Sequence, residues 1–284
     1  MIDSLKTLVN VSKFLGNRVA YVQGGGGNTS LKVSTESMLI KASGNFLADI
    51  TMQKGFIPVD WGILRSEISS CETEIEYGLL LKKSKLIDDI SLKPSIETGF
   101  HAVLNTCTLH SHSVWANILT CAIEGQSIVR KLFPKAIWVP YSTPGLALTK
   151  AIMERVENKR TVTIFLQNHG IVVSAKDSKS ALAMHEKVTN IIREEYPMLL
   201  DFDETKDEVN SSDISGLLFP DQAIYHSSPE LKTSRAGRET MRACEFLLDR
   251  IINAGLTPCY IHESEKHILL NMESEKFRQK LVKI

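Results

Sequence analysis

Apolar residues recur along this chain with two different spacings, and the two spacings alternate over the first 196 residues. An apolar residue at every third or fourth position is typical of a helix, whereas a short apolar run between turn residues is typical of a strand. The first spacing predicts helices over residues 1–16, 71–85, 97–105, 113–123, 145–158 and 180–195. The short runs predict strands over residues 30–33, 37–42, 55–60, 107–112, 136–140 and 161–168. This alternation predicts an α/β sandwich with a central sheet.

The pattern changes at the segment DFDETKDEVNSSD, residues 201–213, which is acidic and contains few apolar residues. Such a stretch buries little surface, so it predicts an exposed linker. The remaining residues predict a small C-terminal α/β extension with a strand near 223–226, a helix over 236–255, a strand over 257–261 and a charged end. This extension carries no catalytic motif. The expected organisation is a catalytic domain (1–200), a linker (201–213) and an extension (214–284).

Charge and composition narrow the classes of partner. The 284 residues include 33 lysines and arginines and 33 aspartates and glutamates, and no polybasic run occurs. We therefore expect neither nucleic acid nor a membrane as a partner. The N-terminal residues lack the apolar core of a signal peptide, and no charge-free apolar run reaches transmembrane length. The five cysteines show no CxxC spacing, which argues against a disulfide framework and predicts a reducing, cytoplasmic location.

Two histidines, His110 and His112, stand two residues apart in a predicted strand. Side chains two apart on a strand point to the same face, and neutral imidazole is a common ligand of zinc. The pair by itself also fits two buried, hydrogen-bonded histidines. A third histidine favours the metal, because His169 ends an apolar strand and precedes Gly170, which permits a sharp turn. Three histidine ligands leave one coordination position open for substrate or water.

A carboxylate, Glu97, lies at the first turn of a predicted helix, where Ser95 can act as the cap. By itself Glu97 fits a simple helix-start carboxylate. Beside a metal, it could instead be a fourth ligand, or a base that substrate binding displaces from the metal. The other histidines suggest less, since His101 and His185 lie within helices and are expected to be packing or surface residues.

Two glycine-bearing turns complete the candidate chemistry. Glycines occupy residues 24–27 and are followed by Asn28, Thr29 and Ser30, and residues 42–45 read ASGN. Backbone N–H groups can approach a ligand closely there, so the turns suit a phosphate or another small anion. Each turn alone also fits a tight turn without a ligand. Neither a P-loop nor a dinucleotide fingerprint is present, because no GK[ST] follows and the next element is a strand.

Six motifs appear in the order in which the class II aldolase/adducin family carries them, so the chain resembles this family over about residues 1–200. The motifs are GGNTS (26–30), ASGN (42–45), PSIE with a histidine four residues on (94–101), HSH (110–112), VPYSTPG (139–145) and NHG (168–170). The segments GGGGNTSLK and LIKASGNFLADI are most similar to the aldolase part of bifunctional rhamnulose-1-phosphate aldolase/alcohol dehydrogenases. No GxGxxG-bearing βαβ unit follows residue 200, so we expect the dehydrogenase part to be missing.

The resemblance implies a three-layer α/β/α sandwich with a central, mostly antiparallel sheet, and a homotetramer. It implies that Zn²⁺ or another divalent metal is held by His110, His112 and His169. It also implies that Glu97 is the general acid/base and that Tyr141 protonates the aldehyde oxygen, often across a subunit boundary. Phosphate binding falls to the glycine-bearing turns and the residue ahead of the helix, here Asn28, Thr29, Ser43, Gly44 and Ser95.

The activity implied by the resemblance is cleavage of a ketose 1-phosphate, or a related sugar, to dihydroxyacetone phosphate and an aldehyde through a metal-stabilised enediolate. Dehydration and 4-epimerisation of a sugar phosphate are alternatives on the same scaffold. Epimerases of the family usually carry aspartate where Glu97 stands, which favours the aldolase reaction. A non-catalytic assembly module of the adducin type is a further alternative, although such modules lack the histidine set that this chain keeps.

Overall fold

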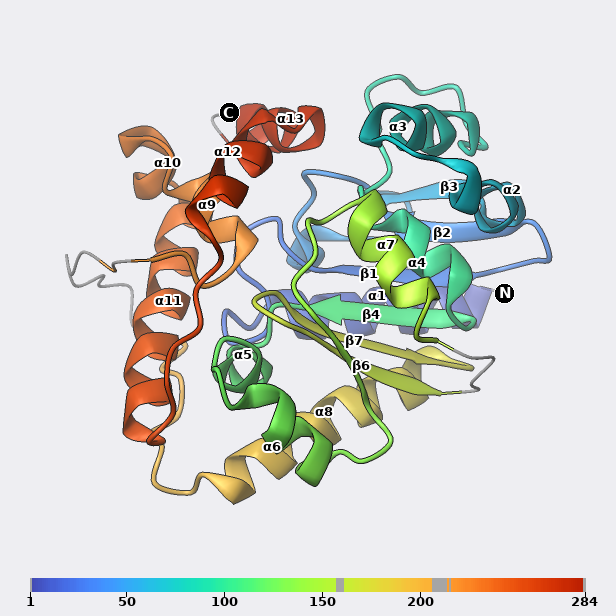
Figure 1. The fold of residues 1–284 in the computed structure, drawn as a ribbon. Helices are drawn as coiled ribbons and strands as arrows, with labels where there is room; N and C mark the ends of the chain where they lie inside the picture. The colour runs from blue at the N-terminus through green and yellow to red at the C-terminus, as the bar shows by residue number, and fades with distance from the viewer. Residues whose placement is uncertain (1, 157–160, 206–213, 215, 283–284) are drawn as a thin grey trace.

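One mixed sheet lies at the centre of the molecule (Figure 1). The computed structural model describes residues 2–156, 161–205, 214 and 216–282, and within them seven strands pair in the order β3-β2-β1-β4-β7-β6-β5. Neighbouring strands are antiparallel except β5 and β6, which are parallel. The strands are β1 (Asn28–Lys32), β2 (Ser37–Lys41), β3 (Phe56–Asp60), β4 (Cys107–Ser111), β5 (Ile137–Val139), β6 (Val162–Leu166) and β7 (Gly170–Ala175).

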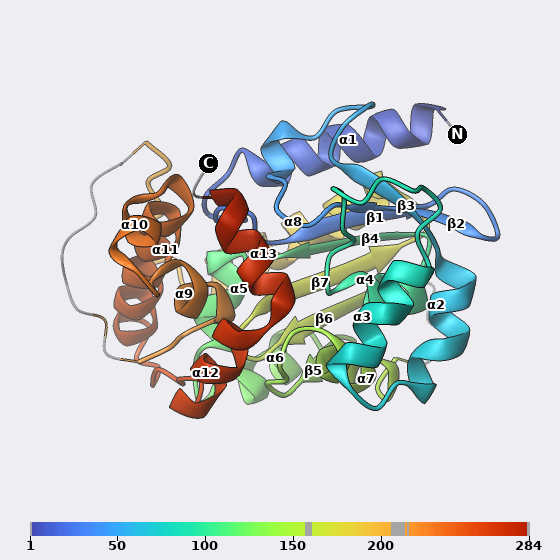
Figure 2. The ribbon, with the colours of Figure 1, turned by 90° about the horizontal axis from the view of Figure 1, so that it is seen from above.

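Two layers of helices cover the two faces of this sheet, as Figure 2 shows from above. One face carries α1 (Ile2–Gly16) and α8 (Ser178–Glu195), and the other carries α2 (Trp61–Glu67), α3 (Glu74–Lys83), α4 (Thr98–Val103) and α7 (Leu146–Met153). Strand side chains alternate between the layers, because Val173 packs with α1 and α8 while its neighbour Val172 packs with α4 and α7. The three-layer α/β/α sandwich and the mostly antiparallel sheet are therefore confirmed.

The elements predicted within the first 196 residues are present, with ends that shift by a few residues. Residues 157 and 158 of the helix predicted over 145–158 lie outside the described residues. The apolar spacing does not predict β7, because the turn between β6 and β7 is so short that the two strands read as one run. Asn168 reverses the chain there with a φ of 52°. The spacing also misses α2 and α6 (Gly125–Leu132), whereas α5 (Val114–Thr120) lies where a helix is predicted.

The C-terminal extension is helical in its described residues, so the two strands predicted in it are wrong. The segment at 223–226 belongs to a helix because Pro220 occupies a first helical position and Asp221 follows in the first turn. The segment at 257–261 forms only isolated bridges, and Pro258 cannot donate to a ladder. The helices are α9 (Pro220–Tyr225), α10 (Pro229–Thr233), α11 (Arg235–Asn253), α12 (Glu263–Asn271) and α13 (Glu273–Val282).

This extension packs against one end of the sheet (Figure 1). Leu247 and Ile251 of α11 are buried in the same apolar cluster as Trp115 of α5. Residues 206–213 of the predicted linker lie outside the described residues, but the described Glu204 accepts hydrogen bonds from backbone N–H groups in the turn after α1. No helix in the described part of the chain is long and apolar enough to span a bilayer. All five cysteines are free thiols.

Candidate metal centre

Three histidines from two segments converge at the end of the sheet that faces the extension. Strand β4 carries His110, and His112 follows that strand directly, while the β6–β7 turn carries His169. The antiparallel pairing of β4 with β7 brings Gly170 against the backbone of Ser111, where an added Cβ would lie 2.2 Å from the Ser111 oxygen. This close approach sets His169 beside the histidine pair, and one nitrogen from each of the three rings lies within 4.8 Å of the others.

The protonation of His110 follows from its partners. Its Nδ1 lies 3.1 Å from the backbone oxygen of Ile171, and because a carbonyl can only accept, Nδ1 carries the proton. Burial lowers the pKa of His110 to about 4 and that of His169 to about 3, so both rings are neutral at pH 7. The Nε2 atom of His110 therefore presents a lone pair, 3.2 Å from Nε2 of His112.

Glu97 brings a carboxylate to the same point. Its Oε2 lies 3.5 Å from His110 Nε2, and its Oε1 lies 3.3 Å from His169 Nε2. Burial opposes the charge of Glu97, but the three histidines and the side-chain amide of Asn28 outweigh that effect and lower its pKa to about 2. Oε1 is buried and has no hydrogen-bond partner among the described residues.

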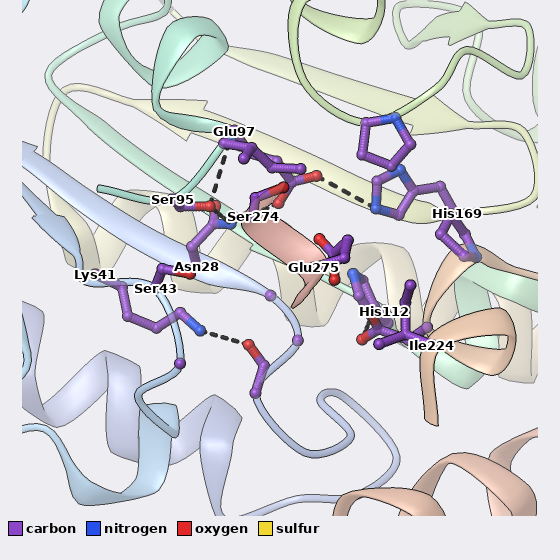
Figure 3. Close-up of a pocket in the computed structure, with 18 of the residues that line it drawn as sticks. Asn28, Lys41, Ser43, Ser95, Glu97, His112, His169, Ile224, Ser274 and Glu275 are labelled. Carbon is purple, nitrogen blue, oxygen red and sulfur yellow. Dashed lines mark hydrogen bonds and ion pairs between the residues drawn. The ribbon is translucent and has the colours of Figure 1, made fainter. Parts of the chain in front are cut away.

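These atoms fit a divalent cation. Nε2 of His110 faces Nε2 of His112 at 3.2 Å and Oε2 of Glu97 at 3.5 Å, and it carries no hydrogen that could bridge these contacts. Oε1 of Glu97 faces Nε2 of His169 at 3.3 Å. A cation between these atoms would stabilise the arrangement. Three nitrogen ligands with an adjacent carboxylate suit zinc and related ions. His110, His112 and His169 are thus brought together as the sequence predicts. Figure 3 shows two of them, His112 and His169, at the same cavity as Glu97.

A chain of hydrogen bonds holds Glu97 in place. Asn28 on β1 pairs with His110 on β4, and its amide nitrogen donates a 2.6 Å hydrogen bond to Glu97 Oε2. The amide oxygen of Asn28 contacts Nε2 of His101, and Nδ1 of His101 lies 2.7 Å from the hydroxyl of Ser30. His101 is therefore more than the packing or surface residue that was expected, because its ring orients Asn28.

Ser95 also supports this loop, although not as the helix cap. Helix α4 begins at Thr98 and Glu97 occupies the cap position, without a side-chain cap hydrogen bond. The Ser95 hydroxyl instead accepts from the backbone N–H of Glu97 at 3.2 Å and from the amide of Asn28 at 3.3 Å. Ser95 therefore connects the acid/base candidate to strand β1.

The glycine-bearing turns form one wall of a cavity next to the histidines (Figure 3). Asn28, Ser43, Gly44 and Ser95 line it, as predicted for an anion site. Thr29 does not line it, because adjacent strand residues point to opposite faces and its hydroxyl lies 2.7 Å from Ser12 on α1. The backbone N–H of Ser43 donates to the carbonyl oxygen of Lys93, in the segment ahead of Glu97, at 2.8 Å.

Lys41 is a cavity residue that the sequence reading does not identify. Its side chain is buried, with the residue only 2% exposed, and the ammonium donates to the backbone oxygens of Gly25 at 2.6 Å and Asn45 at 2.9 Å. It therefore joins the two glycine-bearing turns and adds a positive charge to the wall. A lysine at the end of an otherwise apolar strand is the signal that could have identified it.

Tyr141 lies apart from the cavity of its own chain. Its hydroxyl is 3.4 Å from Glu265 of α12, and the hydroxyl of Thr143 donates to the same carboxylate at 2.8 Å. Burial and the Glu265 carboxylate raise the pKa of Tyr141. The catalytic role of Tyr141 thus stays a prediction.

The extension contributes to the cavity, against the expectation that it holds no site. Asp221, Ile224, Leu269, Ser274 and Glu275 line the cavity. Asp221 Oδ2 lies 3.3 Å from His112 Nδ1, and Glu275 is only 3% exposed. With Ser274 and Glu275 of α13 in place, about 40 Å³ of free volume remains. Sequence spacing gives no signal for these residues, because tertiary packing alone brings α9 and α13 to the histidines.

Comparison with known proteins places this site in a family context. The sequence model of the class II aldolase and adducin N-terminal domain matches residues 6–196. An oxidoreductase of Bacillus subtilis named YuxG, described as uncharacterized, is 27% identical over 223 residues. That match covers 75% of this chain but 31% of YuxG, so the chain spans about a third of the length of this relative.

Solved structures share the fold of the main part of the chain. The N-terminal class II aldolase domain of a conserved protein from Thermoplasma acidophilum superposes with a TM-score of 0.60 at 23% identity, covering 68% of this chain and 93% of the domain. YgbL from Klebsiella pneumoniae, for which aldolase, epimerase and decarboxylase are the suggested activities, superposes with a TM-score of 0.52 at 20% identity, covering 69% and 89%. Similarity at this identity establishes the fold alone.

Proposed function

The chain belongs to the class II aldolase and adducin family, and on that premise we propose that it is a divalent-metal-dependent aldolase. The proposed reaction cleaves a ketose 1-phosphate to dihydroxyacetone phosphate and an aldehyde. One observation carries the proposal: the Glu97 carboxylate lies within 3.5 Å of two of the three converging histidine nitrogens, beside a cavity lined by anion-binding residue types. This arrangement supports an acid/base role for Glu97 next to a proposed Lewis-acid site.

Zn²⁺ or a related ion, held by His110, His112 and His169, would supply Lewis-acid polarisation of the substrate oxygens and stabilise developing negative charge. The side chains of the chain itself perform the other tasks. The hydroxyls of Ser43 and Ser95 bind the phosphate, supported by the charge of Lys41, whereas the side-chain amide of Asn28 is used to hold Glu97.

Glu97 handles the proton at C3. In condensation the Glu97 carboxylate removes a proton from C3, and in cleavage the same group returns a proton to C3, which balances the proton that the C4 hydroxyl gives up. Its fixed position beside Asn28 suits this role, since a positioned acid/base contributes roughly 10²–10⁴-fold to a rate. We further propose that Tyr141 acts on the C4 hydroxyl proton in a neighbouring subunit of a homotetramer, because it lies apart from the cavity of its own chain.

The competing reactions would use the same residues, so only the identity of the products distinguishes the aldolase from a dehydratase or an epimerase. Dehydration or 4-epimerisation of a sugar phosphate would need the same metal site but would give a product that keeps all its carbons. The oxidoreductase name of YuxG concerns a protein about three times as long as the matched region, and we do not extend it to this chain.

The test is a screen of the full-length, metal-loaded protein against ketose 1-phosphates and the corresponding free ketoses. Released dihydroxyacetone phosphate is measured with a coupled dehydrogenase, and the sugar products are identified by NMR. We expect carbon–carbon cleavage of at least one phosphorylated ketose, with no release from metal-free protein. Products that keep all their carbons would instead support the dehydratase or epimerase, and metal-free protein that is fully active would overturn the proposal.

A further inference from the structure

The extension places a carboxylate directly against one of the metal-ligand candidates. Asp221 in the first turn of α9 lies with its Oδ2 3.3 Å from His112 Nδ1. Both residues are buried, Asp221 at 2% exposure and His112 at 3%. The contact is an ion pair rather than a formed hydrogen bond, and His112 Nδ1 has no hydrogen-bond partner within the described residues. The carboxylate is therefore the acceptor available to this ring nitrogen.

The two nitrogens of His112 face different partners. Nε2 points to the centre of the histidine cluster, 3.2 Å from Nε2 of His110, while Nδ1 faces Asp221. A neutral imidazole carries one proton, so a proton on Nδ1 leaves Nε2 free to bind a metal. The backbone oxygen of Ile171 fixes His110 in the same tautomer. In two of the three rings, His110 and His112, an acceptor therefore faces Nδ1, the nitrogen that points away from the cluster.

Gly26 and the residues at the start of α9 make room for the contact between Asp221 and His112 and hold it in place. A Cβ on Gly26 would lie 2.6 Å from Asp221 Oδ2 and 2.8 Å from His112 Nδ1, so only glycine leaves room for the pair. The start of α9 is held by Gln222, whose Oε1 accepts from the backbone N–H of Leu218 at 2.8 Å. The backbone oxygen of Leu218 in turn accepts from the amide of Asn168, next to the ligand His169.

We propose that Asp221 is a positioning residue of the metal centre: its carboxylate accepts a hydrogen bond from Nδ1–H of His112 when the metal is bound and thereby orients His112 Nε2 toward the metal. The C-terminal extension is then part of the metal site, although it supplies no ligand. The inference rests on the proposed metal-dependent function only in requiring that the histidines bind a divalent ion, and it holds whichever substrate is used.

The test measures metal binding rather than turnover. Full-length protein is stripped of metal and titrated with Co²⁺ and Zn²⁺ against a chromophoric chelator, and the visible absorption of the Co²⁺ form is recorded. We expect Asp221→Ala to weaken metal affinity about 10- to 100-fold and to alter the Co²⁺ spectrum. Asp221→Asn should weaken it less, because an amide oxygen still accepts a hydrogen bond. The matched control is Asp249→Asn on α11, an exposed charge in the same extension.

Two further variants keep the test decisive if Asp221→Ala folds poorly. Gly26→Ala changes neither Asp221 nor His112, but its added methyl group forces the two side chains apart, so it should reproduce the loss of metal affinity. In a His112→Ala background, Asp221→Asn should have no further effect on metal affinity, because the ring that it orients is gone. A purely structural role would add the same loss in both backgrounds.

The outcomes separate this proposal from the proposed function. Asp221 variants that fold and bind Co²⁺ with the affinity and spectrum of the parent chain would overturn the positioning role and leave the aldolase proposal intact. If Asp221→Ala shows the expected loss of metal affinity and the parent chain cleaves no ketose phosphate, the positioning role is supported and the aldolase proposal is overturned. A parent chain that binds no divalent metal would overturn both.

Discussion

The side-chain amide of Asn28 donates a 2.6 Å hydrogen bond to Oε2 of Glu97, which leaves Oε1 of that carboxylate facing His169 at 3.3 Å. One carboxylate oxygen is thus fixed by a neutral donor, and the other stays available at the metal centre. Because Asn28 on β1 pairs with His110 on β4, the position of Glu97 is tied to the strand next to the one that carries a ligand candidate. The acid/base and the metal site share one rigid support.

Glu97→Gln separates metal binding from chemistry. Glutamine keeps the shape of the side chain and can still accept from Asn28, but it cannot exchange a proton, so we expect metal content to persist and kcat to fall at least about 100-fold. Metal analysis and steady-state rates on the substrate found in the screen provide the measurement. The exposed Glu36→Gln is the control for charge loss. A Glu97→Gln rate near that of the parent would refute the acid/base role.

Loss of any one ligand candidate should cost both metal and activity. Single changes of His110, His112 or His169 to alanine remove one of three nitrogens from the cluster, so we expect metal per chain, measured by elemental analysis after dialysis, to fall well below that of the parent. His267→Ala alters an exposed histidine on α12 and should leave metal content unchanged. Unchanged metal content in the three cluster variants would show that the ligand set is wrong.

Asn168 connects the ligand-bearing turn to the extension, and its loss should destabilise the fold. The side-chain amide donates to the backbone oxygens of Leu218 at 2.9 Å and Cys259 at 2.7 Å, and the residue has a φ of 52°. Asn168→Gly keeps the left-handed backbone accessible and removes the two hydrogen bonds, at a cost of about 0.5–1.5 kcal/mol each.

Asn168→Ala adds the strain of a left-handed backbone to the same loss, so we expect it to be less stable than Asn168→Gly. Urea unfolding of metal-free protein measures both values. Equal stability of the glycine variant and the parent would mean that the two hydrogen bonds contribute nothing to holding the extension.

The stability of the metal-free chain should decrease on mild acidification, in part through His185. Its ring is buried, lies 2.7 Å from the hydroxyl of Ser111, and burial lowers its pKa to about 4 from an ordinary value of 6.5. The unfolded chain takes up the proton below about pH 6.5, whereas the folded chain resists it until about pH 4. The contribution to stability is therefore complete above 6.5 and is lost as the pH falls from 6.5 toward 4.

His185→Gln should flatten this dependence by up to about 1.4 kcal/mol per pH unit. Unfolding free energies measured between about pH 4.5 and 7.5 give the slopes of the parent and the variant. His267→Gln, which removes an exposed histidine, should leave the slope of the parent. Identical slopes for His185→Gln and the parent would contradict the lowered pKa.

Helix α13 should leave the cavity when a substrate binds. About 40 Å³ is free with Ser274 and Glu275 in place, whereas pockets that enclose small-molecule ligands measure roughly 300–1,000 Å³. The rate of amide hydrogen exchange in residues 273–282 of the metal-loaded protein should therefore increase when a sugar phosphate that binds the site is added. Helix α10 serves as the internal control. Unchanged or slower exchange in α13 at saturating ligand would contradict this displacement.

Short-range pattern and motif order predict the fold and the centre of the site well, because the residues concerned are fixed by neighbours along the chain. The pair His110 and His112 needs only strand alternation to share a face, whereas His169 also needs the pairing of β4 with β7, which motif order but not spacing indicates. The same alternation explains the failure of Thr29, which follows Asn28 on β1 and so points to α1.

The residues that the sequence did not identify act across long separations. Asp221 reaches His112 only because α9 docks on the glycine run, and Glu275 reaches the cavity only because α13 folds back over it. Periodicity describes which side of an element is buried but not which distant element buries it, so these contributions follow from the three-dimensional structure alone.

The amide of Asn168 has a consequence for how this protein can diverge. It couples the turn that carries His169 to segments 50 and 91 positions further along the chain. Natural substitutions around residues 218–221 therefore change the surroundings of the catalytic centre while every recognisable motif stays intact. Relatives with identical signatures but different tails are expected to differ in metal preference and substrate range, and comparing only their signatures would group them together in error.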